Sequence, residues 1–173
     1  MKTTKVSFLF CLVVGLLFAV SVSAQSQTFS DANVEYTFEL PEATWKMSLK
    51  PSLISPNVEY VYGDKSDGHL EIRRITTKSG DMASDLIEKE EQRLQFLQGY
   101  VAEKQESFAG KLKGTVFNYE FVRSGRNMSG RIYYLKYNDT TVYALRFTGE
   151  RDKLRTIRNQ TDSVGRTFDV KAK

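Results

Sequence analysis

The residue types best suited to catalysis or metal binding are scarce in this chain. His69 is the only histidine, so a hydrolytic triad or a histidine-centred metal site would have to use it. It follows a glycine-containing turn and has none of the motif context that either site needs, and we expect a histidine at the surface or at a strand edge. The sequence therefore predicts no catalytic residue, no metal site and no cofactor.

The acidic residues give no specific signal for chemistry either. Asp64 and Asp67 lie in a turn that is too short for a calcium-binding loop of about 12 residues, and they are typical of turn geometry. Glu120 beside Glu39 or Glu71 has the side chains for acid–base work. One sequence does not show that two carboxylates converge, so we assign them no role.

Arginines and tyrosines are the most informative residues, because these types dominate contact surfaces between proteins. Residues 25–110 contain 9 Lys and Arg against 15 Asp and Glu, whereas residues 111–173 contain 14 against 6. We expect a basic and aromatic binding surface made of Arg131, Tyr133, Arg146, Arg151, Arg155 and Arg158. Two simpler interpretations remain open: solvated faces that neutralise each other after folding, and aromatic side chains that serve core packing.

The first 24 residues have the features of a secretory signal peptide. Lys2 and Lys5 precede an uncharged run at 6–20, and small residues follow it. This run is too short to cross a hydrocarbon core of roughly 30 Å. We therefore expect cleavage before Gln25, export, and no membrane-spanning segment in the exported protein.

Cysteine usage agrees with a protein that works outside the cytoplasm without disulfides. Cys11 is the only cysteine and lies inside the predicted signal peptide, so the exported chain would have no thiol and no thiolate metal site. A chain of this length buries about two-thirds of its unfolded surface and needs no disulfide. The short basic region favours a bacterial protein of the periplasm or the extracellular space.

Hydrophobic periodicity predicts one domain over residues 34–170, preceded by a loose polar segment at 25–33. Alternating apolar residues predict a strand at 34–40, which Trp45 and Met47 continue, and further strands at 58–62, 69–77, 103–108, 115–123, 128–137 and 140–148. A period of about 3.6 residues predicts helices at 81–98 and 150–166. Because most connections are too short for parallel crossovers, we expect an α+β fold: a single antiparallel sheet of about six to seven strands with two main helices packed on it.

Four segments resemble the PsbP-like family, which includes the photosystem II extrinsic protein P and the bacterial DcrB-like envelope proteins. They are FELPEATW at 38–45, GTVFNYEF at 114–121, GRIYYLKYNDTTVYALRFTG at 130–149 and TFDV at 167–170. The resemblance covers residues 34–170 and rests on the spacing of aromatic and glycine residues. It implies a central antiparallel sheet with helices on its faces and a non-enzymatic accessory or binding role. The histidines that bind metal in some plant members have no counterpart here.

These features together predict an exported, non-enzymatic accessory or binding protein of the bacterial envelope or extracellular space, which acts through protein–protein contacts. We expect a protein partner, with a glycan or a lipid as alternatives, and no nucleic acid. A second hypothesis is a carrier that holds a lipid or small hydrophobic ligand in a cleft between helices and sheet, which would require a large enclosed cavity. A third is an enzyme of unknown class, which would require a pocket that collects His69, arginines and carboxylates from separate strands.

Overall fold

The computed structural model describes residues 26–171, and the predicted signal peptide lies outside the described residues. The helices are α1 (Ala83–Leu94), α2 (Arg151–Thr156) and α3 (Arg158–Thr167). The strands are β1 (Gln27–Ser30), β2 (Tyr36–Leu40), β3 (Trp45–Leu49), β4 (Val58–Tyr62), β5 (Gly68–Thr76), β6 (Val101–Ala102), β7 (Glu106–Ala109), β8 (Lys113–Arg123), β9 (Arg126–Asn138), β10 (Thr141–Glu150) and β11 (Asp169–Val170). Within this range no helix combines the length and the apolar character needed to cross a membrane.

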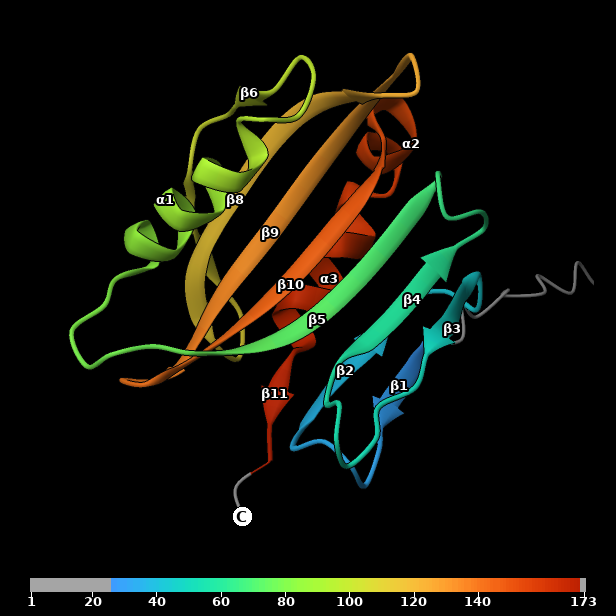
Figure 1. Ribbon diagram of the computed structural model, residues 1–173. Coiled ribbons are helices and arrows are strands. Elements are labelled where there is room, and N and C mark those ends of the chain that lie inside the picture. The colour runs from blue at the N-terminus through green and yellow to red at the C-terminus, as the bar shows by residue number, and fades with distance from the viewer. Residues whose placement is uncertain (1–25, 172–173) are drawn as a thin grey trace, which may run out of the picture.

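The predicted α+β class is confirmed, but the strands form two sheets instead of one. The large sheet has eight antiparallel strands in the order β3-β4-β5-β10-β9-β8-β6, with β7 also paired to β8, and the small sheet has the order β1-β2-β11 (Figure 1). Pro41 explains the difference, since it ends β2 in the small sheet before Trp45 begins β3 in the large sheet. The apolar alternation on the two sides of Pro41 therefore belongs to different sheets.

Strand β1 lies inside the segment 25–33, which the sequence predicts to be loose. Phe29 of β1 is buried and stacks on Phe38 of β2, with ring centroids 4.8 Å apart. Burying one large aromatic ring offsets the entropy of ordering a short strand. A single phenylalanine among polar neighbours therefore orders a segment whose composition is typical of a loose terminus.

The helix predicted over 150–166 is divided into α2 and α3. Ile157 separates them with φ −97° and ψ 15°, and its side chain is buried. The bend allows Leu154 of α2 and Val164 of α3 to join the same apolar cluster as Ile157. Packing of these three residues on the sheet therefore takes precedence over the continuity of the helix.

Each face of the large sheet carries its own apolar core, because neighbouring residues of a strand point to opposite faces. On one face α2, α3 and the small sheet cover a cluster that includes Tyr133 and Phe147. On the other face α1 covers a cluster that includes Ile132 and Tyr134. Figure 1 shows α1 in front of the large sheet and α3 behind it. A side chain of β9 or β10 thus belongs to one site or the other according to its position in the strand.

Candidate binding site

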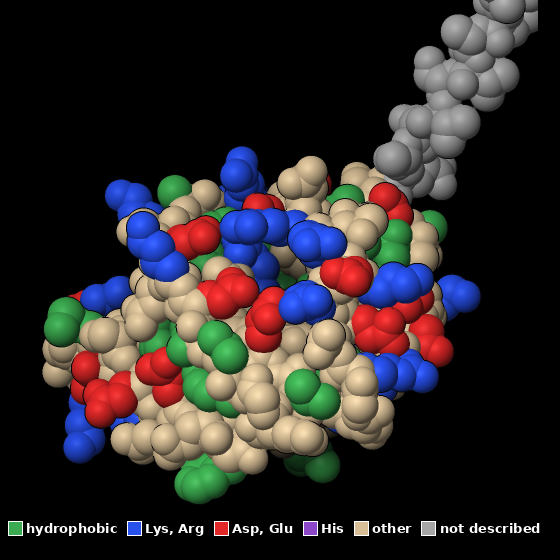
Figure 2. Space-filling view, turned by 90° about the horizontal axis from the view of Figure 1, so that it is seen from above, with side chains coloured by type: hydrophobic (Ala, Val, Ile, Leu, Met, Phe, Trp, Pro, Cys, Tyr) green, Lys and Arg blue, Asp and Glu red, His purple; other side chains and the backbone are tan. Residues whose placement is uncertain are grey.

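A cleft that we name the arginine cleft lies between α2 and the strands β8 and β9. Its volume is about 260 Å³, and its lining includes four arginines. They are Arg131, Arg151, Arg155 and Arg158. Figure 2, which views the end of the molecule that carries α2, shows Lys and Arg side chains close together with acidic side chains between them. Four of the six residues expected in a binding surface therefore meet at one place.

Two of these arginines lie on one side of α2, and a third follows the bend. Arg151 begins α2 directly after β10, Arg155 follows four residues later on the same helix face, and Arg158 begins α3 after the bend at Ile157. The Leu154 side chain is buried, so the apolar side of α2 faces the core. The basic side of α2 therefore faces away from the core.

Arg131 forms the buried floor of the arginine cleft. Its Nε donates to the Tyr133 hydroxyl at 2.7 Å, one terminal nitrogen to Asn118 Oδ1 at 2.7 Å, and the other to Asp162 Oδ1 at 2.8 Å. Burial acts to lower the pKa of Arg131, but the hydrogen bonds and charges of Tyr133 and Asp162 raise it above its usual value. The cleft therefore contains a permanently charged guanidinium with a fixed orientation.

The other three arginines are held loosely. Arg151 lies 3.4 Å from Glu120, Arg158 lies 3.4 Å from Glu106, and Arg155 lies 3.1 Å from Asp152. Exposed ion pairs of this kind contribute about 0–1 kcal/mol, because water and salt screen them. These guanidinium groups can therefore exchange their carboxylates for those of a partner. A guanidinium also binds phosphate or sulfate oxygens in a fork geometry.

Tyr133 and Arg146 do not lie at the surface of the arginine cleft, although both are expected there. Tyr133 is fully buried beneath Arg131, and its hydroxyl donates to Asp162 at 2.5 Å. Arg146 lies on the opposite face of the large sheet, where it pairs with Glu90 of α1. Both differences arise because the alternation along a strand does not indicate which helix covers which face.

A second cleft, which we name the histidine cleft, lies on the α1 face of the large sheet. It has a volume of about 420 Å³, and its lining includes His69, Glu71, Glu90, Arg123 and Arg146. His69 is 6% exposed and belongs to β5, which has β4 and β10 on its two sides. The expectation of a histidine at the surface or at a strand edge is therefore wrong, because the sequence does not reveal these neighbours of β5.

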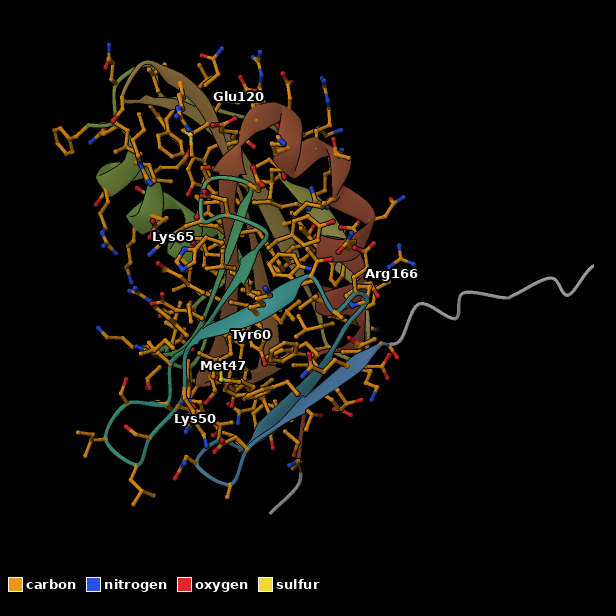
Figure 3. All side chains as sticks on the ribbon, turned by 90° about the vertical axis from the view of Figure 1, so that its right-hand side faces the viewer. Met47, Lys50, Tyr60, Lys65, Glu120 and Arg166 are labelled. Carbon is orange, nitrogen blue, oxygen red and sulfur yellow. The ribbon has the colours of Figure 1, made fainter. Side chains whose placement is uncertain are left out.

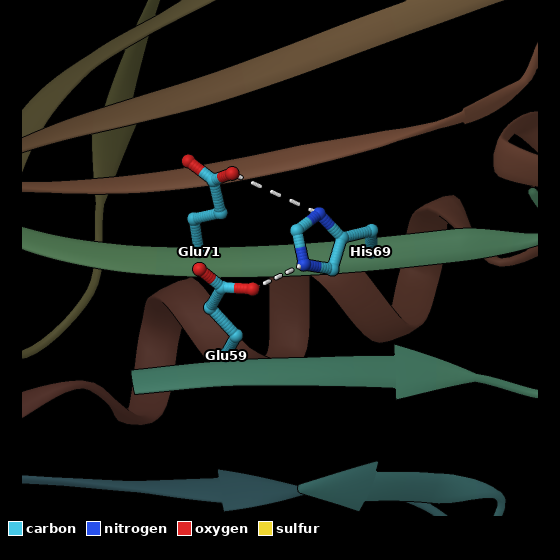
Figure 4. A group of neighbouring side chains, drawn as sticks. All are labelled: Glu59, His69 and Glu71. Carbon is cyan, nitrogen blue, oxygen red and sulfur yellow. Dashed lines mark hydrogen bonds and ion pairs between the residues drawn. The ribbon is translucent and has the colours of Figure 1, made fainter. Parts of the chain in front are cut away.

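The His69 ring lies between two carboxylates. Nε2 is 2.9 Å from Glu59 Oε2, and Nδ1 is 3.9 Å from Glu71 Oε1 (Figure 4). Ligand atoms of these three residues lie within 4.8 Å of one another, so this group is the one that could hold a metal ion among residues 26–171. The two ring nitrogens face different carboxylates, and Arg73 already pairs with Glu71 at 3.1 Å. The geometry describes a network of polar contacts in which the imidazole of β5 contacts a carboxylate of β4.

Glu90 is the residue of the histidine cleft that the sequence could have revealed. It interrupts the apolar stripe of the helix predicted over 81–98, and the structure buries it and pairs it with Arg146 and Arg93. A carboxylate inside an apolar stripe requires a cation.

Replacing His69 with glutamine is expected to lower the free energy of unfolding by about 1 kcal/mol, because the contact with Glu59 is lost. Urea denaturation followed by circular dichroism measures this change. Glu59→Gln is the matched control, since its amide oxygen still accepts a hydrogen bond from the ring, and it should cost less. Unchanged stability of the His69→Gln variant would contradict a structural role for the contact.

Comparison with known proteins supports the fold at the level of architecture. Neither a protein-family model nor a curated protein matches the sequence. Among solved structures, cyanobacterial PsbP (CyanoP) from Synechocystis has a TM-score of 0.54 at 14% identity and covers 91% of this chain and 98% of its own. LpqN, involved in cell envelope biogenesis of Mycobacterium tuberculosis, has a TM-score of 0.54 at 13% identity over 86% of this chain and 91% of its own.

The Ran-binding protein Mog1p of Saccharomyces cerevisiae has a TM-score of 0.61 at 8% identity, over 86% of this chain and 96% of its own. The protein thus has an α+β fold of the PsbP-like kind, as its sequence resemblance implied. At these identities the likeness concerns the fold alone. The arginine and histidine clefts are therefore interpreted from this chain's own residues.

Proposed function

We propose that the protein is an exported, non-enzymatic binding protein of the bacterial envelope or extracellular space, and that the arginine cleft binds acidic groups of a protein partner. One observation carries this proposal: Arg131, Arg151, Arg155 and Arg158 come together from β9, α2 and α3 around one open cleft. Arg131 is fixed in place, whereas the other three can exchange their carboxylates. A fixed cation with adjustable neighbours suits a surface that recognises an acidic segment.

The solved structures of similar fold give further support. LpqN is described as involved in cell envelope biogenesis and Mog1p as Ran-binding. The signal-peptide pattern of residues 1–24 supports export. These points favour a role in binding, with the arginine cleft as the contact surface.

The two alternative functions receive less support. A carrier would hold its ligand in a large enclosed apolar cavity, whereas the arginine and histidine clefts are open and lined by ion pairs. The histidine cleft does bring His69 and Glu71 of β5 together with Arg146 of β10, which is close to the arrangement that an enzyme would need. Each of these groups is already bonded to another charged residue, which favours a structural role for the cleft.

The double variant Arg151→Glu plus Arg155→Glu tests the proposal in a crosslinking pull-down from the native envelope. We expect recovery of the principal partner to fall about tenfold or more, because two attractive contacts become repulsive. The partner's recovery by the unchanged protein should also fall as salt is raised, since the contacts are charged.

Lys78→Glu plus Lys89→Glu is the matched control, because it makes the same change in net charge at two exposed positions outside the arginine cleft. His69→Gln is a second control and should leave recovery unchanged. Equal recovery by the arginine variant and the unchanged protein would refute the proposed surface. If the lysine control lost the partner to the same extent, the loss would come from the change in net charge, and this would also refute the proposed surface. Substrate turnover that disappears in His69→Gln would support the enzyme hypothesis instead.

A further inference from the structure

The loop between β3 and β4 is anchored on both sides. Pro51 is buried at its start, and the Asn33 side chain reaches the Pro51 carbonyl at 3.5 Å. Near its end, the Tyr36 hydroxyl donates to the Pro56 carbonyl at 2.8 Å. The loop thus projects from a well-packed base.

Two aliphatic residues form the tip of this loop. Ser52 and Ser55 exchange backbone hydrogen bonds of 2.8 and 3.2 Å, which closes a tight turn around Leu53 and Ile54. Leu53 is 91% exposed and Ile54 is 96% exposed. The tip therefore presents two complete apolar side chains to the surroundings.

Turn geometry does not account for these residues. Gly, Asn, Asp and Pro are the types that suit a tight turn, and a β-branched residue such as Ile54 is unfavourable there. Burial does not account for them either, because both side chains are outside the core. Their presence at an anchored tip indicates contact with something apolar outside the protein.

The segment that carries the tip is basic, although Asp31 of the neighbouring turn lies 3.9 Å from Lys50. Residues 43–58 contain no Asp or Glu and two lysines, Lys46 and Lys50, although residues 25–110 as a whole are acidic. Both lysines are exposed, and Met47 and Leu49 between them are each 41% exposed. An aliphatic tip that is preceded by one lysine in β3 and by another directly after β3 complements a surface that is apolar inside and anionic outside.

We propose that the Leu53–Ile54 tip inserts into the surface of an anionic lipid bilayer, with Lys46 and Lys50 at the level of the headgroups. A lipid surface fits better than a protein, because a standard protein interface takes roughly 800 Å² from each partner and two projecting side chains supply far less. Fluid lipid accepts a narrow convex tip without a matching pocket. The resulting association is weak and reversible.

This site is separate from the arginine cleft. Figure 3 places Lys50 and Met47 at the opposite end of the molecule from Glu120, which lines that cleft. A protein that rests on a membrane through the tip would therefore present the arginine cleft away from the bilayer. The inference goes beyond the proposed function and stands independently of it.

Sedimentation with vesicles tests the inference. The chain from Gln25 is the suitable protein, since every buried residue of the two apolar clusters lies between Phe29 and Phe168 and the apolar run at 6–20 is excluded. We expect binding to vesicles of phosphatidylglycerol and phosphatidylcholine in equal parts, and about tenfold or weaker binding by Leu53→Ser plus Ile54→Ser. Vesicles of phosphatidylcholine alone should bind the protein several-fold less well.

Phe96→Ser is the matched control, because Phe96 is 83% exposed and belongs to the segment after α1. It should bind vesicles as the unchanged protein does. Lys46→Gln plus Lys50→Gln should weaken binding to the anionic vesicles only.

A fluorescent label at the tip gives a second readout that does not depend on the double variant. Cys11 is the only cysteine in the sequence, so Leu53→Cys in the chain from Gln25 carries one labelling site. An environment-sensitive dye at this position should shift to the blue with anionic vesicles, whereas the same dye at Phe96→Cys should not. No binding by the unchanged protein, equal binding by the serine variant, or equal binding to neutral vesicles would overturn the inference. The inference would also be overturned if vesicles bound neither the unchanged protein nor the serine variant, and the serine variant failed to recover a protein partner in the pull-down. The tip would then bind a protein.

Discussion

The protein is expected to unfold cooperatively when the pH is raised from about 10 towards about 12, because folding keeps most of its tyrosines protonated. Burial raises the pKa of Tyr60 and Tyr119 to about 12. Burial also raises the pKa of Tyr36, Tyr133, Tyr134 and Tyr143 above the ordinary value of 10.0. These six side chains belong to both cores, so their ionisation affects the whole molecule.

The direction follows from the protons bound in each state. Below pH 10.0 a tyrosine is protonated in both the folded and the unfolded chain, and the stabilising contribution of its raised pKa is fully present. Above that pH the unfolded chain loses the proton while the folded protein keeps it, so the free energy of unfolding falls until the folded pKa is passed. At about pH 11 each buried tyrosine lowers the free energy of unfolding by about 1.4 kcal/mol. Six such residues lower it by roughly 8 kcal/mol, which is comparable to the whole stability of a typical domain.

Circular dichroism and the ultraviolet absorbance of phenolate measure this transition together. Both signals should change at the same pH, since the buried phenols ionise only when the chain unfolds. Tyr60→Phe is the matched variant: it removes one buried phenol, so the stability should fall less steeply with pH and the midpoint should move upward. Gradual ionisation without loss of the dichroism signal would contradict the expectation.

Strands with a long and regular apolar alternation could be predicted from the sequence. Strands predicted at 128–137 and 140–148 are found as β9 (Arg126–Asn138) and β10 (Thr141–Glu150), because their apolar alternation is long and regular. The strand predicted at 103–108 matches only the short strand β7 (Glu106–Ala109), and β6 (Val101–Ala102) precedes the predicted range; the residues of both strands are mostly exposed. The division into two sheets depends on contacts between distant segments, such as β2 with β11, which periodicity does not contain.

The candidate site was predictable to a similar extent. Arg151 and Arg155 could be identified because one face of α2 determines their direction, and Arg158 follows them directly after the bend at Ile157. The place of Arg146 and the burial of Tyr133 and His69 depend on which elements cover each strand, and this requires the fold. The ion pair between Arg146 and Glu90 joins residues 56 positions apart. A polar residue in an apolar stripe indicates that such a partner exists, but it does not identify the partner.

Removing the carboxylate beneath the arginine cleft is expected to destabilise the protein strongly. Asp162→Ala deprives Arg131 of the ion pair at 2.8 Å and the Tyr133 hydroxyl of an acceptor at 2.5 Å. Arg131 then remains as a buried charge without its counter-ion, and breaking such a pair costs about 3 kcal/mol. The midpoint of urea denaturation measures the loss.

Asp152→Ala is the matched control, because Asp152 also pairs with an arginine of the cleft but both side chains are about three-quarters exposed. It should cost less than about 1 kcal/mol, since water screens the pair, and the other losses are an exposed contact of 4.0 Å with Arg151 and one acidic residue in the first turn of α2. Equal losses for the two variants would contradict the distinction between a buried and an exposed arginine. The double variant Arg131→Met plus Asp162→Leu should recover most of the stability, because no unpaired charge remains.

The same variants separate the structural role of Arg131 from its role in binding. Asp162→Ala removes a negative charge next to the cleft, so the protein that still folds should recover an acidic partner at least as well as the unchanged protein. Arg131→Met plus Asp162→Leu restores the packing but removes the fixed guanidinium, and its recovery of that partner should fall. Stability and binding would then change in opposite directions in the two variants. This result is expected only if the buried ion pair holds Arg131 in position and Arg131 itself contacts the partner.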